Sequence, residues 1–337
     1  HHIIHMLGGR AVHPVFGLPG GVSKGLNEEE RKEVEQIAKD SVEFAKLSLK
    51  VFDDIVLKNK EYVDMVLSDA YTHRTYYMGL VDDKNKVNFY DGKVRVVDPE
   101  GKEFAKYSPR EYLDHVAEHV EPWTYVKIPF LKKVGWKGFV DGKDSGVFRA
   151  TPLSRLNAAD GMATPLAQEA YEKFYATLGG KPVHQTLATH WARLVELLYA
   201  AERLLELSQD PEITNPNFRT IPTAIPDEGV GIVEAPRGTL THHYITDEKG
   251  VIKKANLIVA TVNNAAAINM SIKKAAQALI KPGKEITEGL LNRIEMAWRP
   301  YDPCWGCATH SLPGQMPLEV IIYDAQGNAV KKLSRSA

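Results

Sequence analysis

Only two of the 337 residues are cysteines, and both lie in one short segment near the C-terminus, Asp302-Pro303-Cys304-Trp305-Gly306-Cys307-Ala308-Thr309-His310. This count rules out a fold built on disulfide bonds. The C-x-x-C pair presents two soft sulfur ligands, which suit nickel, iron, copper(I) or zinc better than magnesium or calcium. Two cysteines cannot complete a four-sulfur site, so a metal bound here needs further ligands from elsewhere.

Composition limits the class of protein. With 44% hydrophobic residues, 25% charged residues and a net charge of -1, the chain resembles a globular protein with one large domain or two. A nearly neutral chain is a poor partner for nucleic acid, because phosphates must be neutralised by a basic surface. No run of 18 apolar residues is present, so no membrane span is predicted. No signal peptide is visible, and the expected compartment is the reducing cytoplasm.

The first residues, His1-His2-Ile3-Ile4-His5, include no initiator methionine. We therefore expect the natural N-terminus to lie upstream.

A long amphipathic helix is predicted from Asn27 to about residue 57. Asn27 and Glu30 have the spacing of a capping box. Apolar residues recur at helical spacing and predict one buried face. These residues are Val34, Ile37, Phe44, Leu47, Val51 and Ile55. A shorter helix should follow up to Leu67.

The segment 75–148 is predicted to be a β-rich insertion. Asp91-Gly92 between residues 87–90 and 93–97 indicates a hairpin. Further strands are expected at 125–130 and 138–147, and a short helix is expected to begin at Ser108-Pro109.

Helices and strands alternate in the rest of the chain. Helices are predicted at 165–178, 183–208, 264–280 and 286–298, and strands at 231–235, 241–246, 251–259 and 318–323. The predicted class is mainly α, a long-helix core with small β-rich appendages (α+β), in a single domain spanning 1–337.

The residues around the cysteines leave several interpretations open. The pair could be a redox dithiol, half of a zinc site completed by His242-His243, or two structural thiols. Pro300 and the preceding helix disfavour the thioredoxin arrangement, in which C-x-x-C follows a strand. Asp302 and His310 add a carboxylate and an imidazole to the same segment, and together they favour a metal site.

A second candidate group is Arg237, which stands between Pro236 and Gly238. With proline before it and glycine after it, Arg237 is expected to have a fixed backbone direction, so the guanidinium can be a fixed cation in a pocket. A surface salt bridge is the alternative interpretation.

Together these motifs resemble the large subunit of the nickel-iron hydrogenases, over essentially the whole chain. The similar segments are Gly8-Gly9-Arg10-Ala11-Val12-His13-Pro14 with Pro19-Gly20-Gly21, Pro152-Leu153-Ser154-Arg155-Leu156-Asn157 with 162–167, Glu234-Ala235-Pro236-Arg237-Gly238, and Asp302-Pro303-Cys304-x-x-Cys307-x-x-His310. The terminal motif is highly specific. Cys307-Ala308-Thr309-His310 and Thr241-His242-His243-Tyr244 are more similar to the cytoplasmic branches, which couple to nicotinamide, deazaflavin or heterodisulfide-reductase partners.

The resemblance implies a metal centre, Ni-Fe(CN)2CO, bound through the cysteines. Cys304 would be a terminal nickel ligand and Cys307 would bridge nickel and iron. Arg237 would lie over the open coordination position with Asp302 near it, and both would assist heterolytic cleavage of H2.

The resemblance also implies supporting roles. Thr261 would donate a hydrogen bond to a cyanide, and Pro236 would line the pocket for the diatomic ligands. Ala260 stands where many relatives have proline. The carbonyl of Leu257 and the side chain of His310 would bind a magnesium or iron ion.

The resemblance is incomplete at the front of the family pattern. The first block, with another C-x-x-C and a nearby glutamate, and the histidine-rich second block are absent. A truncated chain, a split gene and a degenerate relative are the three explanations, and the intact later motifs favour truncation. A non-catalytic scaffold, similar to one component of complex I-like assemblies, is the alternative function.

The family implies partners as well. With no further cysteines this chain is expected to carry no iron-sulfur cluster, so electrons would pass to an iron-sulfur small subunit, then to flavin, heterodisulfide-reductase or NAD-type subunits. Residues 8–21, including Arg10 and His13, are the candidate interface with the small subunit. A maturation endopeptidase would cut after His310, so that 311–337 is a removable extension.

Overall fold

The computed structural model describes residues 1–283, 285–304 and 318–335, and the chain divides into two compact units, His1–Tyr301 and Asp302–Ala337. The first unit contains the described helices and most of the described strands. The prediction of an α+β fold with a long-helix core is confirmed.

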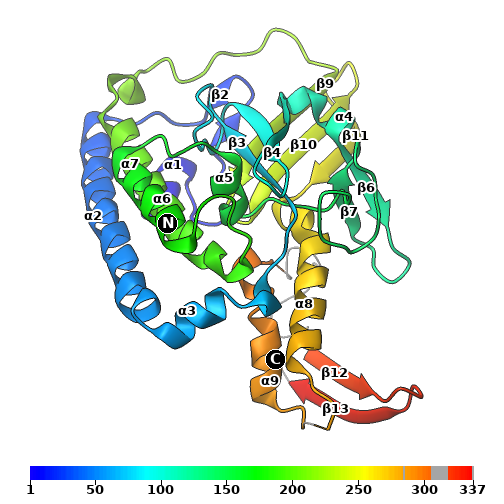
Figure 1. The fold of residues 1–337 in the computed structure, drawn as a ribbon. Helices are drawn as coiled ribbons and strands as arrows, with labels where there is room; N and C mark the ends of the chain where they lie inside the picture. The colour runs from blue at the N-terminus through cyan, green and yellow to red at the C-terminus, as the bar shows by residue number, and fades with distance from the viewer. Residues whose placement is uncertain (284, 305–317, 336–337) are drawn as a thin grey trace. The chain divides into compact units, whose positions relative to one another are not determined.

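The helices of the first unit gather mainly on one side of it, where α2, α6 and α7 run close together (Figure 1). In the described residues the α-helices are α1 (His2–Gly8), α2 (Glu28–Phe52), α3 (Lys60–Val66), α4 (Tyr112–His115), α5 (Pro152–Ala158), α6 (Pro165–Leu178), α7 (Thr189–Gln209), α8 (Ala265–Leu279) and α9 (Glu288–Glu295). Short 3-10 turns include η3 (Pro109–Glu111), η4 (Thr186–Ala188), η6 (Ala260–Asn264) and η7 (Arg299–Tyr301).

The strands of the first unit form separate small sheets. A four-stranded sheet has the order β5-β4-β3-β8, from β3 (Tyr76–Val81), β4 (Lys93–Val97), β5 (Glu103–Tyr107) and β8 (Phe148–Arg149). An antiparallel meander has the order β11-β10-β9, from β9 (Glu228–Ala235), β10 (Gly238–Thr246) and β11 (Ile252–Ile258). Two-stranded pairs are formed by β1 (Gly17–Leu18) with β2 (Gly21–Val22) and by β6 (Val116–Val120) with β7 (Lys127–Leu131).

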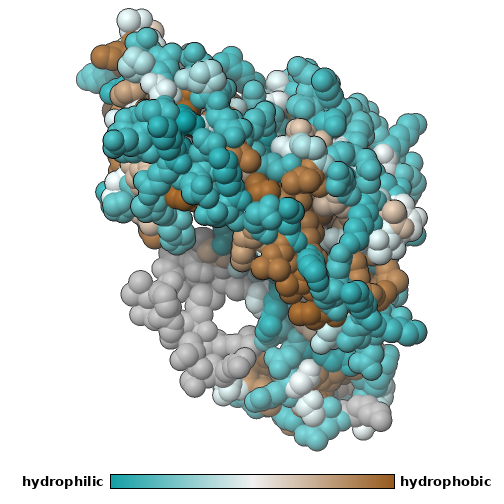
Figure 2. Space-filling model, turned by 90° about the vertical axis from the view of Figure 1, so that its left-hand side faces the viewer, coloured by the Kyte–Doolittle hydropathy of each residue, from teal (hydrophilic) through white to brown (hydrophobic). Residues whose placement is uncertain are grey.

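The long helix α2 begins where the sequence predicted, with a complete capping box at Asn27 and Glu30. The predicted buried face is wrong in its second half, because Phe44, Leu47, Val51 and Ile55 are between 45% and 62% exposed. The helix carries two apolar stripes, and the one that packs on α7 contains small residues that allow close approach. This inner stripe is Val34, Ala38, Val42 and Ala45. Apolar side chains also reach the surface on the face shown in Figure 2.

Three other predicted elements differ in the structure. Residues 87–90 form no strand, and β4 pairs with β3 instead, so the predicted hairpin is wrong. The predicted strand 138–147 is also wrong, since its residues lie outside any strand and only β8 follows it. The helix predicted from residue 183 begins at Thr189, after the turn η4.

Helix α5 connects the helical core to the sheets and is buried at all 7 positions. Its N-terminus is capped by Thr151, whose Oγ1 accepts from the Ser154 amide at 3.2 Å. The helix packs on β3 at Gly79, where an added Cβ would lie 2.9 Å from the Arg155 Cα. Glycine is therefore needed at this close approach, which brings Arg155 against the sheet.

The second unit is described at residues 302–304 and 318–335. It contains an antiparallel hairpin of β12 (Leu318–Tyr323) and β13 (Ala329–Arg335). The predicted strand 318–323 is confirmed as β12.

Candidate functional site

Arg237 lies in the tight turn between β9 and β10. The strands pair up to Ala235 opposite Gly238, so the loop contains only Pro236 and Arg237. The turn leads into β10 and lies close to η6, because a Cβ on Gly238 would lie 2.5 Å from the Ala150 carbonyl oxygen and 2.8 Å from that of Ala260. Glycine is therefore the residue that lets the backbone pass between these two carbonyls.

Arg155 of α5 holds this turn by hydrogen bonds to its backbone. Its guanidinium binds Glu196 of α7 in a bidentate pair, with both N···O distances 2.6 Å. It also donates to Glu234 Oε2 at 3.0 Å, to the Ala235 carbonyl at 3.0 Å and to the Pro236 carbonyl at 3.4 Å. All five N–H groups of the side chain therefore have acceptors.

This cluster is almost entirely shielded from water. The side chains of Arg155 and Glu234 are 1% exposed and that of Glu196 is 7% exposed. Glu234 also accepts from the Leu80 amide at 2.8 Å and from the Thr239 hydroxyl at 3.0 Å. Burial raises the pKa of Glu234, an effect that the Arg155 cation opposes.

The other predicted pocket residues of the first unit come close to the turn through Asn264. Its side chain is fully buried, donates to the Arg237 carbonyl at 3.0 Å and accepts from the Ala150 amide at 2.8 Å. Asn264 ends η6, the turn that contains Ala260, which is buried, and Thr261, which is half-buried. The structure thus brings the turn of Arg237 together with Ala260 and Thr261.

Leu257 lies near the end of β11, opposite His242 of β10, and its side chain is 43% exposed. It belongs to the same meander as Arg237.

The terminal motif lies in the second unit and is only partly described. Asp302 has a left-handed backbone, with φ of 50°, and Cys304 follows it outside any helix or strand. Cys307 and His310 lie outside the described residues. Tyr301, the last residue of the first unit, is buried and its hydroxyl lies 2.9 Å from the Ser271 hydroxyl.

The structure does not support a zinc site completed by His242 and His243 together. His242 and His243 are neighbours on β10, so their side chains point to opposite faces of the strand. Both ring nitrogens of His243 already have partners, the Tyr112 hydroxyl at 2.9 Å and Glu228 at 2.8 Å. Across residues 1–283, 285–304 and 318–335, no three His, Cys, Asp or Glu side chains converge as a metal site requires.

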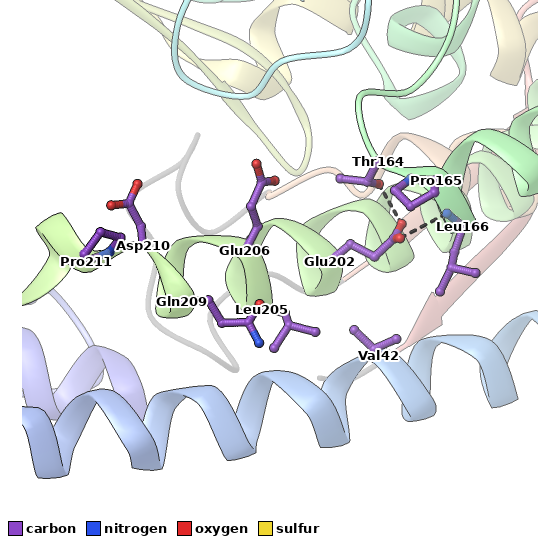
Figure 3. Close-up of a pocket in the computed structure, with 10 residues that line it drawn as sticks. All are labelled: Val42, Thr164, Pro165, Leu166, Glu202, Leu205, Glu206, Gln209, Asp210 and Pro211. Carbon is purple, nitrogen blue, oxygen red and sulfur yellow. Dashed lines mark hydrogen bonds between the residues drawn. The ribbon is translucent and has the colours of Figure 1, made fainter.

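A groove elsewhere in the first unit contains none of the predicted site residues. It lies between α2 and α7, and Figure 3 shows Glu202 reaching from α7 to Thr164 and Leu166 at the start of α6. Among the described residues, its lining includes the carboxylates of Glu202, Glu206 and Asp210 but no cysteine or histidine.

Glu196 is the residue of this cluster that the sequence interpretation missed. It lies four residues after Ala192 and three before Tyr199, both buried on α7. A carboxylate within an apolar helical face is costly to bury without a cation. This position is the signal by which the partner of Arg155 could have been found.

The chain belongs to the nickel-dependent hydrogenase family, whose model matches residues 1–310. Among its relatives, an iron-sulfur subunit of the F420-non-reducing hydrogenase of Archaeoglobus profundus is 52% identical over 98% of this chain and 68% of its own length. The NAD-reducing hydrogenase HoxS subunit beta of Cupriavidus necator is 39% identical over 99% of this chain and 67% of its own length.

Solved structures agree with this family. An NAD+-reducing [NiFe]-hydrogenase in the H2-reduced state superposes with a TM-score of 0.81 at 33% identity, covering 90% of this chain and 64% of that one. A [NiFeSe]-hydrogenase of Dm. baculatum, at 21% identity and a TM-score of 0.63, covers 92% of this chain and 66% of that one and shares the fold. The chain therefore spans about two thirds of the length of the proteins it matches. None of the described helices has the length and apolarity needed to cross a membrane.

Proposed function

We propose that this chain is the catalytic subunit of a cytoplasmic nickel-iron hydrogenase, which cleaves H2 heterolytically and reversibly. The observation that carries the proposal is the turn at Pro236-Arg237, held beside Ala260 and Thr261 by buried side chains from two other elements. In a member of the nickel-dependent hydrogenase family, this is the arrangement expected for a preorganised cation above a reactive centre.

The residues of the chain fit a nickel-iron centre in part. Cys304 and Cys307 supply two soft thiolates, which metal binding keeps deprotonated at neutral pH. Because the chain has only these two cysteines, any further sulfur ligands have to come from another polypeptide or another part of a longer one. When bound, the centre with its carbon monoxide and cyanides supplies the electron-rich metals at which H2 is split.

The protein side chains then divide the remaining work. Arg237 supplies a permanent cation, and Asp302 supplies a carboxylate that can accept a proton. Thr261 would donate a hydrogen bond to a diatomic ligand of the bound centre, and Pro236 and Ala260 would line that pocket. The Leu257 carbonyl and His310 would hold a magnesium or iron ion.

Electrons leave through a partner in this proposal, because two cysteines cannot ligate both the metal pair and an iron-sulfur cluster. The partner is an iron-sulfur small subunit, with residues 8–21 as its contact, followed by flavin, heterodisulfide-reductase or NAD-type subunits. An endopeptidase removes 311–337 after the metal is inserted.

The test is the intact complex purified without oxygen from its native cells. We expect nickel and iron in the preparation, H2-dependent reduction of a viologen dye, and infrared bands of metal-bound carbon monoxide and cyanide. A complex that contains this chain but neither metal would refute the proposal.

Arg237→Lys tests the role of the cation, because an ammonium cannot reproduce the placement of a guanidinium. We expect H2 oxidation to fall by roughly 100-fold with both metals retained. The matched control is Arg203→Lys on the surface of α7, where the arginine pairs with the exposed Glu206. Near-normal turnover of the Arg237 variant would exclude the assigned role.

A further inference from the structure

The turn that carries Arg237 does not have the backbone that two-residue hairpins prefer. Such loops favour types I′ and II′, which place at least one central residue at positive φ. Proline fixes φ of Pro236 near -65°, and Arg237 is not among the described non-glycine residues with positive φ. Local preference therefore does not determine the geometry of this turn, and other contacts have to hold it.

Three consecutive carbonyls provide those contacts. The carbonyls of Ala235 and Pro236 accept from Arg155, and the carbonyl of Arg237 accepts from Asn264. Both donors are fully buried and belong to elements outside the β9–β10 hairpin. Hydrogen bonds therefore hold the backbone on both sides of the Arg237 Cα, the atom that carries the side chain: the Pro236 carbonyl precedes it and the Arg237 carbonyl follows it.

Arg155 can act as an anchor only because it is itself fixed. Glu196 holds it from α7 through two bonds, and Glu234, at the base of the same turn, holds it through a third. Gly79 leaves no space for α5 to move toward β3, since even a methyl group there would clash with the Arg155 backbone. Displacing the guanidinium would leave two carboxylates buried without their cation, which is strongly unfavourable.

A second buried arginine, Arg95, shows that a buried guanidinium can be paired with carboxylates without binding the Arg237 turn. Arg95 also binds two carboxylates, Glu103 and Asp160, and one carbonyl, that of Ala158. These acceptors lie in the four-stranded sheet and at the end of α5, and none of them belongs to the β9–β10 turn. Arg95 is therefore a chemically matched comparison for Arg155.

We propose that Arg155 and Glu196 are positioning residues for the hydrogenase reaction: they hold the backbone of the Pro236-Arg237 turn and so set the direction of the Arg237 guanidinium. This assignment rests on the proposed function for its catalytic consequence, but the grip on the turn is a property of the chain alone.

The first experiment tests, in the chain without any metal, whether Arg155 and Glu196 restrain the backbone of the Arg237 turn. Amide hydrogen exchange of the peptide spanning 234–240 is compared in the wild-type chain, Arg155→Lys, Glu196→Gln and the control Arg95→Lys. A lysine has one compact ammonium and cannot reach the carboxylates and both carbonyls together. We expect faster exchange at this peptide in the Arg155 and Glu196 variants and an unchanged rate in the Arg95 variant.

The second experiment uses the assembled enzyme. We expect Glu196→Gln and Arg155→Lys to lower kcat for H2 oxidation about 10-fold to 100-fold per bound nickel, with little change in KM for H2. The infrared bands of the diatomic ligands should shift in the same variants. Asn264→Asp keeps the acceptor for the Ala150 amide but replaces the donor to the Arg237 carbonyl with a carboxylate oxygen, whose charge adds repulsion at this buried position. We expect it to lower kcat at least as much, which keeps the idea testable if the Arg155 variant does not fold.

Two outcomes would overturn the assignment. One is exchange at 234–240 that is equal in all variants, which would show that Arg155 does not hold the turn. The other is a loss of activity that follows the loss of nickel alone, which would indicate a purely structural cluster. A wild-type complex without metal or H2 turnover would refute the proposed function, while the exchange comparison would still decide whether the turn is gripped.

Discussion

Removing the carboxylate of Glu202 should weaken the first unit measurably without altering the Arg237 turn. Glu202 lies on α7, but its oxygens cap the N-terminus of α6 (Figure 3). Oε1 accepts from the Leu166 amide at 3.0 Å, and Oε2 accepts from the Ala167 amide at 2.8 Å and from the Thr164 hydroxyl at 2.6 Å. Thr164, the N-cap residue, makes no side-chain cap bond of its own.

The expected cost follows from these bonds. Loss of a helix cap costs about 1 kcal/mol, and an anion at a helix N-terminus adds roughly 0.5 kcal/mol. Hydrogen bonds to an ionised group are stronger than neutral ones, by roughly a further 1 kcal/mol here. We therefore expect Glu202→Ala to lower the free energy of unfolding by about 2–4 kcal/mol. Water in the adjoining groove can reach the freed amides, which favours the lower end of this range.

The assay is urea denaturation followed by far-UV circular dichroism, with thermal melts in parallel. For a unit of this length, His1–Tyr301, a loss of this size should lower the melting temperature by roughly 3–6 °C. Glu206→Ala is the matched control, because Glu206 lies one turn further along α7 in the same groove and pairs with Arg203 at the surface. Its cost should stay below about 1 kcal/mol. Equal midpoints for the two variants would show that Glu202 does not cap α6.

Three further predictions concern stability and maturation. Phe44→Ser on the exposed stripe of α2 should change the free energy of unfolding by less than about 0.5 kcal/mol, whereas Phe174→Ala in the core should cost about 3–5 kcal/mol in the same urea titration; similar costs would contradict the placement of the α2 faces. Burial and the nearby Arg149 cation lower the pKa of His184 from 6.5 to about 4, so the unfolded chain binds a proton between these values while the folded chain does not. The contribution of His184 to stability is complete above pH 6.5 and is lost as the pH falls toward 4. His184→Gln should therefore make the melting temperature less dependent on pH between these values. An unchanged pH dependence in this variant would show that other groups cause it. Intact mass of the chain from an active, metal-loaded complex should end at His310, and an active enzyme that retains Ala337 would contradict removal of the extension.

Elements with complete local signals could be predicted from the sequence. Helix α6 has Pro165 in its first turn and Gly179 in a left-handed conformation at its end, and its bounds agree with the prediction. The β9–β11 meander agrees with the strands predicted at 231–235, 241–246 and 251–259, and Gly250 has a left-handed backbone in the turn between the last two. In these segments the local preference and the tertiary structure agree, so no distant contact was needed to identify them.

The predicted hairpin at Asp91-Gly92 was wrong because a glycine can be needed either for a hairpin turn or for a close approach to another strand. Gly92 does have a positive φ, but a Cβ there would lie 2.1 Å from the Val81 carbonyl oxygen. Glycine is needed because β4 begins beside β3, and this close approach is invisible in the local sequence. The two stripes of α2 pose a similar problem, since periodicity identifies apolar faces but not which one meets α7.

The Arg237 turn was predictable from Pro236 and Gly238, which flank the arginine and mark a break between two strands. Its support was not, because the bonds of Arg155 to Glu196 and Glu234 join three elements that are far apart in the sequence. The positions of these side chains depend on how α5, α7 and β9 pack together, and no short motif records that packing.

The grip on the Arg237 turn acts through main-chain oxygens, which every amino acid possesses. The shape of the turn is therefore largely decoupled from the side chain that it displays, so position 237 can be altered while its scaffold persists. A series of substitutions at this position should then report on charge and reach alone, which makes the turn a natural place to vary the chemistry of the enzyme without redesigning its architecture.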